Sequence, residues 1–215
     1  MPPKSTPDMR VFRRRLVAWF RRHGRDLPWR RTRDPYQVLV SEVMLQQTQV
    51  SRVAEYYPVF LNRYPTIHDL ARAKPQQVRE VWQGLGYYRR AANLHRLAQE
   101  VVAQRDGRLP ADPSELLKLP GIGRYTAGAV ATFAFERPHP AVDTNVVRVL
   151  KRAFHPRAAG GTGTKQLWAT ATRLQPRAGN AAWTFNQAIM ELGALVCTAR
   201  VAKCGECPVA GVCRT

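Results

Sequence analysis

Acidic residues are scarce in this chain of 215 residues, because 15 Asp and Glu stand against 34 Lys and Arg and leave a formal net charge of +19. Long apolar runs are also missing, and none approaches the roughly 20 residues that a membrane-spanning helix needs. The polar and then arginine-rich start is unlike a secretory signal. We therefore expect neither a membrane-spanning nor a secreted protein. The charge predicts a polyanionic partner, either nucleic acid or an acidic membrane surface, with a general arginine bias as the alternative.

Strand-like alternation of apolar and polar residues is nearly absent. Apolar residues instead recur at helical spacing between Pro and Gly residues, as in the basic segment 9–22, where Asp8 is the expected N-cap. The sequence therefore predicts an all-α fold. The expected helices cover residues 9–22, 36–49, 51–63, 66–72, 75–84, 88–104, 113–118, 124–136, 143–154, 164–174 and 179–196.

No cysteine precedes residue 197, and the four that follow have the spacing Cys-x6-Cys-x2-Cys-x5-Cys: Cys197, Cys204, Cys207 and Cys213. Two disulfides can be drawn, but a basic helical chain without a secretory signal is expected in a reducing compartment. Four thiolates suit either zinc or an iron–sulfur cluster. Structural zinc commonly uses two close Cys-x2-Cys pairs, whereas one such pair is flanked here by longer arms. The spacing therefore favours a metal site over disulfides, and iron–sulfur over zinc.

A Pro-Gly-Ile-Gly turn (120–123) separates two of the expected helices. Gly121 and Gly123 permit a backbone path that larger residues would obstruct. That path points the free N–H groups of the helix near Arg124 outward, where they and the helix dipole favour a phosphate. Many helix–helix turns share so short a pattern. With Arg124 and the strong positive charge, it predicts a sequence-independent contact with a DNA backbone.

Two acidic residues stand in unusual places. Glu42 lies in a segment, 38–45, whose apolar side chains point in nearly every direction around a helix. We expect Glu42 to be buried, which favours the protonated carboxyl of a general acid; a buried pair with an arginine is the structural alternative. Asp143 begins an expected helix and is a predicted N-cap, a place that also keeps a carboxylate ionised. A protonated and an ionised acid together can cleave a glycosidic bond through an oxocarbenium-like state.

Together these motifs resemble those of the helix-hairpin-helix DNA glycosylase superfamily, relatives of endonuclease III, and most closely its adenine DNA glycosylase (MutY-type) branch. The resemblance runs from about Arg25 to Cys213, and the length and order of its motifs make it specific. The motifs are Asp-Leu-Pro-Trp-Arg (26–30), Ser-Glu-Val-Met-Leu-Gln-Gln-Thr-Gln-Val (41–50), Gly-Leu-Gly-Tyr-Tyr (84–88), Leu-Pro-Gly-Ile-Gly-Arg-Tyr-Thr-Ala-Gly (119–128), Val-Asp-Thr-Asn-Val (142–146) and the four-cysteine spacing.

The resemblance implies two helical lobes. One contains residues 1–29 and 139–215, and its four cysteines would hold a [4Fe–4S] cluster. The other contains residues 30–138, with the helix-hairpin-helix at 113–136. DNA would be bound bent, with the target nucleotide flipped into a pocket. The residues expected at the DNA backbone are Gly121, Gly123, Arg124, Arg200 and Lys203.

The resemblance also implies roles at the reacting base. Glu42 would protonate adenine at N7, Asp143 would stabilise the sugar cation or bond to it transiently, and Asn145 would orient that carboxylate. Tyr125 occupies the position where a lysine would make a bifunctional lyase, so base removal without dedicated strand cleavage is expected. The residues expected to line or support the adenine pocket are Arg25, Trp29, Arg30 and Gln187. Those expected to wedge into the duplex are Gln47, Leu85 and Tyr87, although Leu85 and Trp29 could be simple core and Gln47 a surface amide.

Typical adenine glycosylases continue after the cluster into a domain that recognises 8-oxoguanine, which we expect this short form to lack. Thr144 also stands where the family usually has glycine. We expect a monomeric, monofunctional enzyme that hydrolyses adenine opposite 8-oxoguanine or G in double-stranded DNA. Its expected location is cytoplasmic, nucleoid-associated and of the bacterial type, without a membrane partner. The alternatives are a thymine/uracil glycosylase acting on T:G or U:G mismatches, which Gln46 and Gln47 disfavour, and a lesion-sensing DNA-binding module, against which the two acids argue.

Overall fold

The computed structural model describes residues 8–156 and 163–215 of the chain. Over these ranges the regular elements are α-helices and 3-10 helices, and β-type pairing is limited to an isolated bridge between Cys197 and Ala202. The predicted all-α fold is therefore confirmed. None of the described helices combines the length and the apolar character needed to cross a membrane. Residues 1–7 and 157–162, which belong to the expected cluster lobe, lie outside the described residues.

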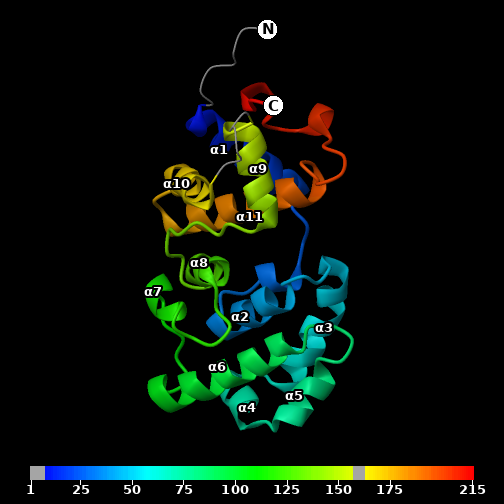
Figure 1. Cartoon of the computed structure of the whole chain (residues 1–215), viewed down its shortest axis with the longest axis vertical. Helices are drawn as coiled ribbons and strands as arrows, with labels where there is room; N and C mark the ends of the chain where they lie inside the picture. Colours follow the sequence, from blue (N-terminus) through cyan, green and yellow to red (C-terminus); the bar gives the residue numbers. More distant parts are fainter. Residues whose placement is uncertain (1–7, 157–162) are drawn as a thin grey trace. The chain divides into compact units, whose positions relative to one another are not determined.

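Two compact units make up the chain, and Figure 1 labels their helices. The contiguous unit is Asp26–Phe135, and the split unit joins Met1–Arg25 to Glu136–Thr215. The split unit therefore takes residues from both sides of the contiguous one along the sequence.

The contiguous unit packs around α2 and α6. Helix α6 contacts α4 and α5, while α2 contacts η1, α3, α6 and α8. Asp34 caps α2 and Pro35 occupies its first position, two features that favour a helix start. All residues from Val38 to Met44 are buried, so α2 is enclosed on every side. The elements of this unit are η1 (Pro28–Arg30), α2 (Pro35–Met44), α3 (Val50–Arg63), α4 (Ile67–Arg72), α5 (Pro75–Val81), α6 (Arg89–Arg105), α7 (Pro113–Leu116) and α8 (Arg124–Phe133).

The split unit has its own apolar core, to which α1, α9, α10 and α11 all contribute. Helix α1 contacts α10 and α11, and α9 contacts α10 and α11. The predicted N-cap of α1 is confirmed, because Asp8 accepts hydrogen bonds from the backbone N–H groups of Arg10 and Val11. The elements of this unit are α1 (Met9–His23), α9 (Thr144–Phe154), α10 (Thr164–Leu174), α11 (Gly179–Leu195), η2 (Cys204–Glu206) and η3 (Ala210–Val212).

The helix predicted over 36–49 ends at Met44, so the prediction is wrong for its last turn. The chain leaves the helical path at Gln47, which has a left-handed backbone with φ of 57°. The carbonyls of Val43 and Met44, which a longer helix would pair with N–H groups four residues on, accept hydrogen bonds from the Arg90 guanidinium instead. Gln46 and Gln47 therefore lie in a loop rather than on a helix.

Candidate active site

Glu42 lies on α2 and is only 3% exposed, so its predicted burial is confirmed. The hydroxyl of Tyr125, in the first turn of α8, donates a hydrogen bond of 2.7 Å to Glu42 Oε2. Because α2 and α8 pack against each other, both side chains are held by helices rather than by loops. A second contact joins the loop after α2 to α8, since Gln46 Nε2 donates to Thr126 Oγ1 over 3.3 Å. A buried carboxyl that a tyrosine hydroxyl orients is suited to deliver a proton to a bound base.

The turn before α8 needs glycine at one of its two predicted positions. Gly121 has φ of 76°, and a Cβ there would lie 2.7 Å from the Cβ of Asn93. A Cβ at Gly123 would meet nothing within 4 Å, so the prediction of an obstructed path is wrong for this position. Gly123 caps α8 without a side-chain hydrogen bond, and its surroundings within the chain are open. Arg124 beside it is exposed.

The residues predicted to wedge into a duplex divide into exposed and buried ones. Gln47 is exposed, and Tyr87 is 60% exposed. Both have left-handed backbones, with φ of 57° and 49°. Leu85 is buried at 5% exposure. Trp29, predicted for the adenine pocket and not for the wedge, is also buried, with its ring edge-on to Tyr57 at 5.7 Å between centroids. The geometry of the last two fits the alternative of packed core.

Asp143 caps α9, as predicted, by accepting a hydrogen bond of 2.7 Å from the backbone N–H of Val146. The helix start acts in the expected direction, because its backbone hydrogen bonds lower the pKa of Asp143 and so favour the ionised carboxylate. Burial raises the pKa of Asp143 above its usual 3.8, and it outweighs the opposing contributions of the Val146 and Asn145 hydrogen bonds and the Arg148 charge. The fold therefore buries the Asp143 carboxylate, and this burial has a cost in desolvation free energy.

A chain of hydrogen bonds runs from Asp143 to the first cysteine. Asn145 Nδ2 donates to Asp143 Oδ2 over 2.9 Å, and Arg148 donates to Asn145 Oδ1 and to the backbone oxygens of Gly193 and Cys197, each over 2.7 Å. Gly193 permits this approach of α9 to α11, since a Cβ there would lie 2.6 Å from Asn145 Cβ. Asn145 thus orients the carboxylate, and Arg148 fixes Asn145. The sequence reasoning missed Arg148.

Two of the predicted pocket residues, Arg25 and Gln187, lie in the split unit, while Trp29 and Arg30 belong to the contiguous unit. Arg25 is bound by Glu191, which is 1% exposed and accepts a hydrogen bond of 2.9 Å from the Arg25 backbone N–H and two of 2.8 and 2.9 Å from its guanidinium. This pairing raises the pKa of the Arg25 guanidinium. Gln187, on α11, is buried, and Arg30 is partly exposed in η1.

The cysteine segment follows α11, and none of its four cysteines forms a disulfide. Burial and the charges of the other three cysteines raise the pKa of the Cys207 thiol. Arg152 Nη1 donates a hydrogen bond of 3.4 Å to Cys197 Sγ. Arg200 and Lys203 are exposed.

Four cysteine thiols are a donor set that either zinc or an iron–sulfur cluster accepts. Within the described ranges, no three His, Cys, Asp or Glu side chains are grouped as ligands of one ion. In a [4Fe–4S] cluster each cysteine binds a different iron, so the four thiols need not converge on one point. The residues that would hold such a cluster are Cys197, Cys204, Cys207 and Cys213.

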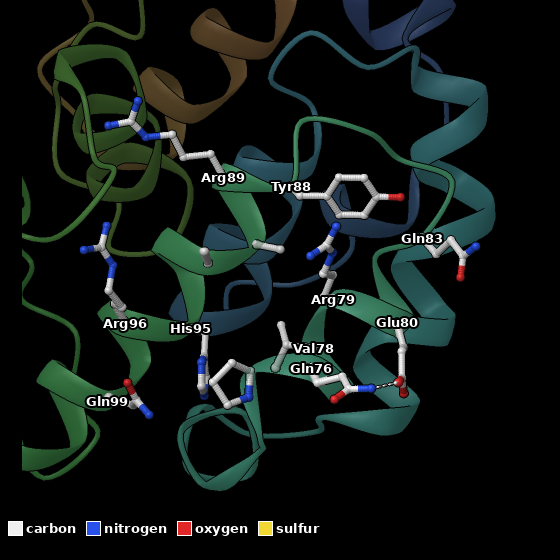
Figure 2. Close-up of a pocket in the computed structure, with 13 residues that line it drawn as sticks. Gln76, Val78, Arg79, Glu80, Gln83, Tyr88, Arg89, His95, Arg96 and Gln99 are labelled. Carbon is white, nitrogen blue, oxygen red and sulfur yellow. Dashed lines mark hydrogen bonds between the residues drawn. The ribbon is translucent and has the colours of Figure 1, made fainter.

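A groove of about 1070 Å³ lies along α5 and α6 and includes none of the predicted site residues. In Figure 2, Arg79 lies beside Tyr88, and Gln76 donates a hydrogen bond of 3.1 Å to Glu80. The guanidinium of Arg79 lies 5.1 Å from the centroid of the Tyr88 ring. These side chains border the segment 84–88, one of the two segments from which the predicted wedge residues come.

The geometry can be set beside known families. The family model described as HhH-GPD superfamily base excision DNA repair protein matches residues 40–170, which is more than half of the chain. The chain belongs to this superfamily. The match includes Glu42 and Tyr125 of the contiguous unit and Asp143 of the split unit.

Relatives with this superfamily's site act on different bases. Adenine DNA glycosylase of Mycolicibacterium smegmatis is 48% identical over 90% of this chain and 66% of its own length. Adenine DNA glycosylase of Rattus norvegicus is 44% identical over 96% of this chain and 42% of its own length. Thymine-DNA glycosylase of Aeropyrum pernix is 38% identical over 94% of this chain and 93% of its own length. The chain thus spans about two-fifths of the rat relative and about two-thirds of the mycobacterial one.

Solved structures agree on the fold. A thermostable thymine-DNA glycosylase has a TM-score of 0.87 at 32% identity, over 95% of this chain and 94% of its own. A non-covalent complex of endonuclease III with DNA has a TM-score of 0.81 at 26% identity, over 96% of this chain and 94% of its own.

Proposed function

We propose that the protein is a monofunctional DNA glycosylase that removes adenine mispaired with 8-oxoguanine or G from double-stranded DNA. The observation that carries the proposal is the buried carboxyl of Glu42, which accepts a hydrogen bond from the Tyr125 hydroxyl. A tyrosine at position 125 offers no amine to form a Schiff base with the sugar, so no lyase step is expected. Identities of 44% and 48% with adenine DNA glycosylases support adenine as the base.

Each group has one task in the proposed hydrolysis. The Glu42 carboxyl donates its proton to N7 of the flipped adenine, and the bond between C1′ and N9 breaks with its electron pair going to N9. The Asp143 carboxylate, oriented by Asn145, stabilises the positive charge that develops on the sugar. Water then adds to C1′ and gives up one proton, which restores the protonated form of Glu42.

Duplex DNA is the partner that the charge favours. The net charge of +19 matches a polyanion, and the exposed residues Arg124, Arg200 and Lys203 can neutralise phosphates without reading sequence. We propose that one copy of the chain acts on one mispair. The endonuclease III structure, which is a DNA complex, supports DNA as the partner.

Single-turnover release from matched duplexes tests the choice of base. Duplexes that carry A opposite 8-oxoguanine, A opposite G, T opposite G and U opposite G differ only at the mispair. We expect adenine release from the first two and intact strands until alkali cleaves the abasic product. Quantifying free base and strand scission separately measures both parts of the proposal.

Thymine release is the second candidate, and a specific observation favours it. The thymine-DNA glycosylase of Aeropyrum pernix matches over 93% of its own length, so it resembles this chain in size as well as in sequence. Release of thymine or uracil with adenine left in place would replace the adenine proposal with this one. Release of no base from any duplex would contradict both.

We further propose that the four cysteines hold a [4Fe–4S] cluster, which would tie together the segment that carries Arg200 and Lys203. Protein purified without oxygen is expected to contain about four iron atoms and four acid-labile sulfides per chain. Replacing Cys207 with serine should lower both together, because it removes one of the four thiols that would bind the cluster. Zinc without sulfide in the unmodified protein would contradict the proposal.

A further inference from the structure

Arg90, at the start of α6, is a buried cation without a carboxylate partner among the described residues. It is 9% exposed, and burial lowers the pKa of its guanidinium. It lies on the apolar side of α6, together with Leu94, Leu97 and Val101. A positive charge in the first turn of a helix is unfavourable, and a buried charge is costly unless it is well paired. Helix stability therefore does not explain why an arginine occupies this position.

The Arg90 guanidinium instead donates hydrogen bonds to backbone oxygens of two separate segments. Nη1 donates to the carbonyls of Val43, Met44 and Gln46 at 3.0, 2.7 and 2.5 Å. Nη2 donates to Thr48 Oγ1 at 3.0 Å and to the carbonyls of Leu85 and Gly86 at 3.2 and 3.1 Å. One side chain thus joins the segment 43–48 to the segment 84–88. Because the carbonyls of Val43 and Met44 form the negative end of α2, that helix end also favours the charge.

Both segments carry a strained backbone at the residue that is exposed. Four non-glycine residues in the described ranges have positive φ, and two of them are Gln47 and Tyr87. Such conformations persist when the surrounding structure determines them, and they concentrate at functional positions. The Arg90 guanidinium lies 5.5 Å from the centroid of the Tyr87 ring and 5.4 Å from that of Trp82.

Further side chains fix the second segment from its other side. Arg52 donates to the carbonyl of Gly84 from Nε and Nη2 at 3.3 and 3.1 Å, and Trp82 Nε1 donates to the carbonyl of Gly86 at 3.1 Å. Arg79 lies over Tyr88, as Figure 2 shows. The hydrogen bonds of Arg52 and Trp82 described here are made to the 84–88 segment, whereas those of Arg90 are made to both segments.

We infer that Arg90 is a positioning residue that holds the Gln47 and Tyr87 segments in a fixed relation, so that both side chains enter the duplex as one rigid wedge when the target base is extruded. This inference rests on the proposed function. It assigns Arg90 to base extrusion and not to cleavage of the glycosidic bond. Lysine at position 90 keeps the charge but cannot reach both segments with a planar fork.

Adenine release from two duplexes separates extrusion from cleavage. One duplex has normal pairs on both sides of the target, and the other has flanking mispairs that leave the adenine already unstacked. We expect Arg90→Lys to slow release roughly 10²-fold from the first duplex, the size of effect that a misplaced group produces. The second duplex should be cleaved at nearly the unmodified rate, with an unchanged pH profile.

The matched control is Arg89→Lys, the same substitution at the exposed neighbouring residue. It should leave the ratio of the two rates unchanged. Thr48→Val removes one acceptor of Arg90 with little change in volume, and it should shift the ratio in the same direction by less. Thr48→Val keeps the inference testable even if Arg90→Lys lowers the yield of folded protein.

Fluorescence of 2-aminopurine placed at the target position, measured with Glu42→Gln protein, reports extrusion without any cleavage. Arg90→Lys in that background should suppress the fluorescence rise on binding. Equal slowing on both duplexes, or an unchanged fluorescence rise, would overturn the positioning role. If the unmodified protein releases no adenine, the proposed function fails, and the fluorescence measurement decides the inference about Arg90 by itself.

Discussion

Replacing Glu42 with glutamine should slow adenine release by about 10²- to 10⁴-fold, which is the contribution that a general acid makes in enzymes. Glutamine keeps the size of the side chain and can still accept the Tyr125 hydroxyl hydrogen bond with its amide oxygen. It carries no carboxyl proton to donate to N7. Single-turnover release from duplexes with A opposite 8-oxoguanine measures the loss, and fluorescence anisotropy of a labelled duplex measures binding.

Binding of the duplex should be retained. Glu42 is buried, so its replacement leaves the exposed positive charges available to the phosphates. Tyr125→Phe is the matched control: it keeps the ring and removes only the hydroxyl that orients the acid, so its effect should be smaller. Adenine release by Glu42→Gln protein at the rate of the unmodified protein would contradict the role of Glu42 as general acid. A lesion-sensing DNA-binding module would show no base release in any variant, including the unmodified protein.

Replacing Asp143 with asparagine should slow base release by about 10²- to 10³-fold, because it removes the charge that stabilises the sugar cation. Asparagine is as good a helix N-cap as aspartate, so α9 should keep its start. In the unmodified protein, the rate should fall as the pH falls through the pKa of Asp143. That acidic limb should lie above pH 3.8, because burial raises the pKa. Rates between pH 4 and 8 measure it.

Arg148→Met tests the direction in which a neighbouring charge shifts the pKa of Asp143. The Arg148 charge lowers the pKa of Asp143, so its removal should move the acidic limb to higher pH and slow the reaction most in mildly acidic buffer. The hydrogen bond from Arg148 to Asn145 is lost as well, so the rate at high pH should also decline. A limb that stays in place, or moves to lower pH, would contradict the role given to Asp143.

The sequence was informative wherever a local pattern decides the structure. Asp8 and Asp143 cap helices because a short acceptor before an apolar run satisfies backbone N–H groups, and this depends on a few neighbouring residues. Glu42 is buried because apolar residues surround it on its own helix. These features could be predicted without knowledge of the tertiary structure.

Features that depend on distant residues could not be predicted. Arg89 and Arg90 are adjacent and chemically identical, yet one is exposed and the other is buried with six acceptors. The signal that separates them is the position of Arg90 in line with Leu94, Leu97 and Val101. The early end of α2 has the same origin, because its last carbonyls are taken by a residue far along the chain. The raised pKa of Asp143 likewise reflects burial that only the folded unit supplies.

The division into a contiguous and a split unit has a consequence for synthesis. The contiguous unit can complete its internal packing as soon as Phe135 has emerged from the ribosome. The apolar side of α1, with Phe12 and Leu16, is made first but packs in a core to which α11 contributes, so it must wait for nearly the whole chain. During that interval α1 is an unpaired amphipathic helix with many arginines. Its apolar side therefore stays without its partner helix until α11 has been made.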